Sequence, residues 1–250
     1  MSQLSAEKYV AKFAAIGASL VSVLVLTGNV SDPVNAPKLF LLGATAVGLL
    51  TMTYRKNSFA SQNTLAKLFN IFLLLFVTWA FVSSLVSVSP FSQNLYGVYG
   101  RNTGLLTYSF LSIWAFVISR LSTHSSISRV MNAFVTVRFI NILYCAWVLL
   151  FGDFVSWNNP YKAILGTFGN PNFISSFLGM FLTVIAAYCL GSNKKRRIAY
   201  LLFIPVITWE LYNADSLQGI VVSIVGVWIV VCYWLFANVS KRIYSYILFF

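Results

Sequence analysis

Two asparagines and a proline interrupt an apolar stretch in the segment ILGTFGNPNFISSFLG, residues 164–179. Asn170 followed by Pro171 is typical of a helix start, because asparagine accepts hydrogen bonds from free N–H groups and proline suits the first helical position. The free N–H groups and the dipole of such a helix start also suit an anion, such as a headgroup or a pyrophosphate. Asn170 and Asn172 are therefore candidate substrate-binding residues, and a plain helix start is the alternative interpretation.

A second polar segment, YGVYGRNTGLL at residues 96–106, contains Arg101. The planar guanidinium of arginine matches phosphate oxygens better than an ammonium group does, which makes Arg101 a candidate for binding phosphate. Tyr96, Tyr99 and the glycines also fit an aromatic belt with turns at a membrane interface. In that interpretation Arg101 only marks the start of an apolar run.

A third polar segment, WELYNADSLQG at residues 209–219, contains Glu210 and Gln218. A carboxylate in lipid is costly unless it faces a cavity or the interior of a helix bundle, and the alternative is that Glu210 reaches the interface. Arg138, in an earlier apolar run, could be its partner. Because Arg138 lies near the start of its run, we expect its side chain to extend to the cytoplasmic surface instead. Gln218 is a further substrate-binding candidate.

The sequence lacks the motifs of metal-dependent and nucleotide-driven enzymes. It contains no HExxH, no P-loop, no GxSxG and no DxD-type cluster of carboxylates. Cys145, Cys189 and Cys232 lie singly in apolar runs without CxxC spacing, and His124 is the only histidine. We therefore expect no metal site and no cofactor.

The composition indicates a membrane protein. The chain is 59% hydrophobic and 9% charged, with a mean hydropathy of +0.81, whereas about a quarter of the residues of a soluble domain are charged. The apolar runs are continuous and do not alternate, which argues against a β-barrel. The net charge of +12 is spread over short clusters between apolar runs, so it indicates membrane topology and no nucleic-acid partner. We expect an all-α, polytopic transmembrane bundle in the lipid bilayer, forming one domain over residues 1–250.

Apolar runs predict eight complete spans, most of them near the ~20 residues that a spanning helix needs. The first run lacks a cleavage signature and is interpreted as a retained span. The runs are 9–28, 38–54, 67–87, 104–120, 131–152, 172–191, 198–213 and 219–238.

The positive charges orient these spans. With a cytoplasmic N-terminus, thirteen of the 17 Lys and Arg residues fall in cytoplasmic segments, and only Lys38, Arg101 and Lys162 fall outside. The external segments are then 29–38, 88–103, 153–171 and 212–218. These segments contain most of the unusual polar residues.

The C-terminal sequence predicts the start of a ninth span. After Lys241 and Arg242 only eight residues follow, IYSYILFF, and at 1.5 Å per residue they reach about 12 Å into a core of ~30 Å. We expect a C-terminally truncated chain, with a short tail along the membrane surface as the alternative.

Four of these segments, in this order, resemble the O-antigen ligase and polymerase-like membrane family, over about residues 30–235. They are SDPVNAPK, SPFSQNLYGVYGRNTGLL, ILGTFGNPNFISSFLG and, more weakly, NADSLQG. The resemblance implies a GT-C-type glycosyltransferase at the outer face of the bacterial plasma (inner) membrane. Such a protein moves a glycan from an undecaprenyl pyrophosphate carrier to lipid A core, another glycan or a protein, without a metal. Arg101 would hold the pyrophosphate and stabilise the leaving group, with Asn170, Asn172 and Gln218 as further substrate-binding residues.

The chain departs from this family at two places. Ser216-Leu217-Gln218-Gly219 stands where the family often has Ser-Arg-Gly. The family histidine lies in a large external loop that would come after residue 250, and His124, predicted to be cytoplasmic, cannot replace it. The catalytic residue is therefore unknown, and we expect the chain by itself to be inactive. The alternative function is a multi-pass solute or bicarbonate transporter with Glu210 along its path.

Overall fold

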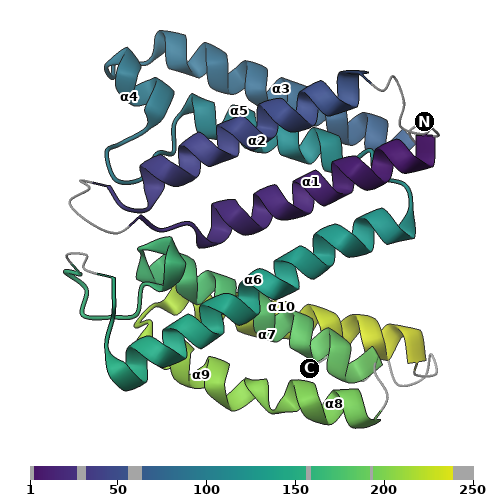
Figure 1. The fold of residues 1–250 in the computed structure, drawn as a ribbon, viewed down its shortest axis with the longest axis vertical. Coiled ribbons are helices and arrows are strands. Elements are labelled where there is room, and N and C mark those ends of the chain that lie inside the picture. Colours follow the sequence, from purple (N-terminus) through teal and green to yellow (C-terminus); the bar gives the residue numbers. More distant parts are fainter. Residues whose placement is uncertain (1–2, 27–31, 56–63, 156–158, 192–193, 239–250) are drawn as a thin grey trace, which may run out of the picture. The chain divides into compact units, whose positions relative to one another are not determined.

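The protein is all-helical in a computed structural model that describes residues 3–26, 32–55, 64–155, 159–191 and 194–238 (Figure 1). No strand occurs among these residues, which confirms the predicted all-α class. The helices are α1 (Gln3–Val23), α2 (Asn35–Arg55), α3 (Thr64–Val86), α4 (Phe91–Tyr96), α5 (Leu105–Ile118), α6 (His124–Phe151), the 3-10 turn η1 (Gly166–Phe168), α7 (Pro171–Gly191), α8 (Lys194–Leu201), α9 (Phe203–Asn213) and α10 (Leu217–Asn238).

Among the described residues, five helices are long and apolar enough to cross a membrane, namely α2, α3, α6, α7 and α10. This confirms the multi-pass membrane character. Helix α5 is apolar but has 14 residues, and α9 has 11. The count of eight complete spans and the cytoplasmic N-terminus stay predictions. The expected start of a ninth span lies in residues 239–250, outside the described residues.

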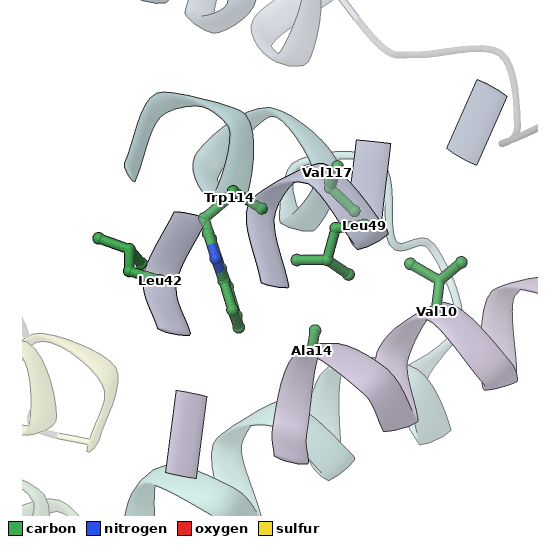
Figure 2. Close-up of a cluster of buried hydrophobic side chains, with 7 residues drawn as sticks. Val10, Ala14, Leu42, Leu49, Trp114 and Val117 are labelled. Carbon is green, nitrogen blue, oxygen red and sulfur yellow. The ribbon is translucent and has the colours of Figure 1, made fainter. Parts of the chain in front are cut away.

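The chain packs into two compact units, unit 1 (Met1–Val137) and unit 2 (Arg138–Phe250). In unit 1, α2 packs beside both α1 and α5, and α3 packs on α5 (Figure 1). Side chains of α1, α2 and α5 form the core, in which the Trp114 indole lies between Leu42 and Leu49 and above Ala14 (Figure 2). Helix α3 has no buried residue, as expected of a helix whose surface faces lipid.

A buried carboxylate joins α1 to the turn between α5 and α6. Glu7 is 5% exposed. Its Oε1 accepts hydrogen bonds from the N–H groups of Ser122 and Thr123 at 2.9 and 2.8 Å, and from Thr123 Oγ1 at 2.8 Å, while its Oε2 accepts one from Ser122 Oγ at 3.0 Å. Burial by itself would raise the pKa of Glu7, but the hydrogen bonds from Thr123 and Ser122 outweigh it and hold the pKa below its usual value.

We predict that Glu7→Gln destabilises the protein by about 1–3 kcal/mol at pH 7, because the amide offers one acceptor oxygen in place of two. Glu7 precedes the apolar run that starts at residue 9 and titrates outside it. Because its pKa is lower when folded, its stabilising effect is present above the unfolded value near 4.5 and is lost as the pH falls through the folded value. Thermal unfolding in detergent between pH 7 and pH 3 should therefore show the wild type approaching the variant in acid. If the difference in unfolding temperature between the wild type and Glu7→Gln were the same at every pH, the stabilising role of the Glu7 carboxylate would be contradicted.

In unit 2, α7 and α10 run side by side in close contact (Figure 1). A Cβ atom added at Gly179 would lie 2.5 Å from the carbonyl oxygen of Gly219, and one added at Gly219 would overlap the backbone of Ser175. Small residues allow such close approach between membrane helices. The small residues at this contact are Ser175, Gly179 and Thr183 on α7, and Gly219, Ser223 and Gly226 on α10.

Candidate functional site

Arg101 lies in a tight loop between α4 and α5. The backbone is left-handed at Gly97 (φ 92°), Gly100 (φ 78°) and Asn102 (φ 47°), and a Cβ atom at Gly97 would lie 2.7 Å from the backbone nitrogen of Gly104. Only glycine accommodates this approach without strain. The loop is held together by its backbone and leaves Arg101 exposed.

This loop is tied to the start of α2. The Nδ2 of Asn35 donates to the carbonyl oxygen of Gly100 at 2.7 Å. The carboxylate of Asp32 accepts hydrogen bonds from the N–H groups of Val34, Asn35 and Ala36 at 3.1, 2.8 and 3.2 Å, and so satisfies the free donors at that helix start. The predicted segments SDPVNAPK and YGVYGRNTGLL, which lie far apart in the sequence, therefore meet in unit 1 at Asn35 and Gly100.

A pocket of about 750 Å³ opens beside this loop, between α2 and α5. Its walls are apolar, and Phe40 and Val47 at its edge are 79% and 56% exposed, so it borders the surface that faces lipid. Asp32, Tyr96, Tyr99 and Asn102 form its polar part. Arg101 does not line the pocket but directly precedes Asn102, which does. The apolar lining residues are Ala36, Leu39, Phe40, Gly43, Ala44, Val47, Leu106 and Phe110.

In unit 2 the GNPN segment forms the helix start that the sequence predicted. Helix α7 begins at Pro171, and Asn170 Oδ1 accepts the N–H of Asn172 at 2.9 Å. The carbonyl oxygen of Asn170 accepts the N–H groups of Phe173 and Ile174. The side-chain oxygen of Asn170 thus caps α7.

Three predicted site residues are brought together where α7 and α10 begin. Ser216 Oγ donates to Asn172 Oδ1 at 2.8 Å, and Ser176 Oγ lies 3.4 Å from Gln218 Oε1 and 2.8 Å from the carbonyl oxygen of Asn172. Both Asn172 and Gln218 are exposed. Asn170, Asn172 and Gln218 therefore form one polar surface in unit 2. The remaining candidate, Arg101, belongs to unit 1, where Asn35 holds its loop.

Asn141, which was not among the predicted site residues, anchors this region to α6. Asn141 is fully buried, and its Oδ1 accepts hydrogen bonds from the N–H and Oγ1 of Thr167 at 3.0 and 2.8 Å. A Cβ atom at Gly166 would lie 3.2 Å from the same oxygen. An asparagine inside an apolar run is a usable signal, because such a group needs hydrogen-bond partners in lipid.

The structure corrects the expectation for Arg138. Its side chain does not extend to the membrane surface, because it is 2% exposed. Its guanidinium lies over the rings of Phe177 and Phe181 on α7, 5.7 and 5.2 Å from their centroids. Attraction between the cation and these aromatic faces favours the buried position.

The side chain of Glu210 faces the packed interior of unit 2 and does not reach the membrane interface. It is fully buried on α9, and neither of its carboxylate oxygens has a hydrogen-bond partner among the described residues. Uncompensated burial of a charged carboxylate is costly.

The described residues contain no group of three or more His, Cys, Asp or Glu side chains arranged to hold a metal ion. The predicted site residues carry amide groups, at Asn170, Asn172 and Gln218, and one guanidinium, at Arg101. In comparisons with known proteins, no family model, no curated protein and no solved structure matches this chain.

Proposed function

We propose that the protein takes part in transferring a glycan from an undecaprenyl pyrophosphate carrier to lipid A core, another glycan or a protein, at the outer face of a bacterial inner membrane. The observation that carries the proposal is the pocket between α2 and α5, whose apolar walls border lipid and whose polar part adjoins Arg101. A polyprenyl pyrophosphate has the matching chemistry, with a long apolar chain and a compact anionic head.

The dimensions of the pocket suit part of an isoprenoid chain. Its lining on α2 extends from Ala36 to Val47, which at 1.5 Å per residue is about 16 Å, roughly half of a hydrocarbon core of ~30 Å. Phe40 and Phe110 supply aromatic surface along this length. The isoprenoid chain of the carrier would lie along α2, and its pyrophosphate head would lie at the loop that carries Arg101.

The polar part of the pocket suits a pyrophosphate. The exposed guanidinium of Arg101 would bind phosphate oxygens in a bidentate manner and stabilise the charge on the leaving group. Asp32 lies in the same region, but its oxygens accept N–H donors from the start of α2, which offsets its charge. Asn170, Asn172 and Gln218 form the polar surface of unit 2 and are the substrate-binding candidates of that unit.

The distribution of cations in unit 1 supports the outward direction of the Arg101 loop. Contacts of Glu7 with Ser122 and Thr123 join one end of the helices, and the contact of Asn35 with Gly100 joins the opposite end. By the positive-inside rule, the end with more cations faces the cytoplasm. The Glu7 end carries Lys8, Lys12, Lys67, Arg120 and Arg129, and the Arg101 end carries Lys38 and Arg101.

We favour glycan transfer over solute or bicarbonate transport as the function of the protein. The transport alternative relied on Glu210 along a solute path, and the buried position of this residue does not favour it.

Carrier binding by the purified chain tests the proposal. We expect the wild type in detergent to bind undecaprenyl pyrophosphate, as measured by titration, and to bind undecaprenol at least tenfold more weakly, because the alcohol has the same chain without the charged head. Ala44→Phe, which fills the apolar pocket, should weaken binding of both lipids. Equal affinity for the two lipids, or no effect of Ala44→Phe, would contradict the assignment of this pocket.

A further inference from the structure

We propose that a second pocket in unit 1 binds the phosphate headgroup of an anionic membrane phospholipid. This pocket of about 500 Å³ lies at the Glu7 end of the unit. It is independent of the glycan carrier and of the proposed function. Its lining residues are Lys8, Tyr9, Lys12, Ala15, Ile16 and Arg129.

Three cations from two helices converge on this pocket. Lys8 and Lys12 are four residues apart on α1, so their side chains emerge on the same face of the helix. Arg129 on α6 donates from Nη1 to the carbonyl oxygen of Lys8 at 3.1 Å, which holds its guanidinium beside α1. All three residues are exposed. Three cationic residues therefore line the pocket, and a hydrogen bond to α1 holds the guanidinium of one of them, Arg129.

The acidic groups of unit 1 do not neutralise these cations. Unit 1 contains two acidic residues, Glu7 and Asp32. The carboxylate of Glu7 points into the protein and is hydrogen-bonded to the turn after α5, and that of Asp32 is bound at the start of α2. Three like charges near one pocket attract an anion from outside the unit.

The apolar lining of the pocket indicates that this anion belongs to a lipid. Ala15 and Ile16 line its apolar side, one to two helical turns further along α1 than the lysines. Ile16 and Tyr9 are 49% and 54% exposed, and tyrosine is typical of the headgroup level of a membrane. A phosphate at the three cations would place an acyl chain along Ala15 and Ile16. Basic pockets between membrane helices bind anionic headgroups in this manner.

Lipid binding to the purified chain tests the proposal, with phosphatidylglycerol and phosphatidylcholine as probes in native mass spectrometry or titration. We expect the wild type to bind phosphatidylglycerol more tightly than phosphatidylcholine. Lys12→Gln should lower the affinity for phosphatidylglycerol about fivefold, the effect of one charge near a membrane surface, and should leave phosphatidylcholine binding unchanged. Lys12→Arg, which keeps the charge, should retain the affinity.

Lys67→Gln is the matched control, because it removes one exposed positive charge from α3, at the same end of unit 1 and outside the pocket. It should bind phosphatidylglycerol like the wild type. An equal loss in Lys67→Gln and Lys12→Gln would overturn the proposal in favour of general surface charge. Binding of inorganic phosphate as tight as that of phosphatidylglycerol would also overturn it, because the apolar lining would then contribute nothing.

Discussion

Replacing Arg101 with alanine is expected to abolish glycan transfer in cells, with a loss of about 10²-fold or more in rate, while membrane insertion is unchanged. Removal of one preorganised group that stabilises developing charge costs roughly 10²–10³ in rate. The Arg101 side chain is exposed, and it makes no hydrogen bond or ion pair within the described residues. The loop is held by its backbone and by Asn35. The variant should therefore fold normally.

Glycan profiles of whole cells, with protein levels in membrane fractions, provide the measurement. Arg101→Lys should retain partial transfer, because lysine keeps the charge but loses the bidentate geometry of the guanidinium. Lys162→Ala is a suitable control, since it removes another exposed cation that is predicted to be external. Normal transfer by Arg101→Ala would exclude Arg101 from the site, and equal losses in both alanine variants would indicate a general effect of external charge.

The helices were predictable because their signal is local. Continuous apolar runs anticipated most of them. The run 198–213 is divided into α8 and α9, and the run 104–120 yields the shorter α5. Gly104 packs against the backbone around Gly97, which fixes a tight loop and sets the start of α5. This close approach depends on packing and is not visible in hydropathy.

The candidate site was predictable only where its chemistry is local. Asn170 caps α7 through a hydrogen bond to a residue two positions away, so the sequence pattern alone identified it. The bond from Asn35 to Gly100 joins residues 65 positions apart, and Arg138 is held over rings of α7. Such contacts depend on which helix faces pack together. Apolar runs without a polar stripe leave those faces undetermined.

Gly219→Ala is expected to lower the stability of the protein by about 3 kcal/mol, at the upper end of the usual cost of overpacking a tight core. The added methyl group would overlap the Oγ and the backbone of Ser175 on α7. It would also disturb the hydrogen bonds by which Ser175 Oγ accepts the N–H of Gly219 at 3.0 Å and donates to the carbonyl oxygen of Ser216 at 3.1 Å. Because α7 cannot move away without losing these bonds, the strain has no easy relief.

Thermal unfolding in detergent measures this loss, with Gly191→Ala as the control. Gly191 ends α7, and a Cβ atom there would meet no atom within 4 Å, so this substitution should leave the unfolding temperature nearly unchanged. Separation of α7 from α10 would also displace Asn172 from Ser216, so Gly219→Ala should disrupt the polar surface formed by Asn170, Asn172 and Gln218. If Gly219→Ala and Gly191→Ala unfold at the same temperature, α7 and α10 do not approach each other closely at Ser175 and Gly219. The polar surface formed by Asn170, Asn172 and Gln218 would then lose its structural support.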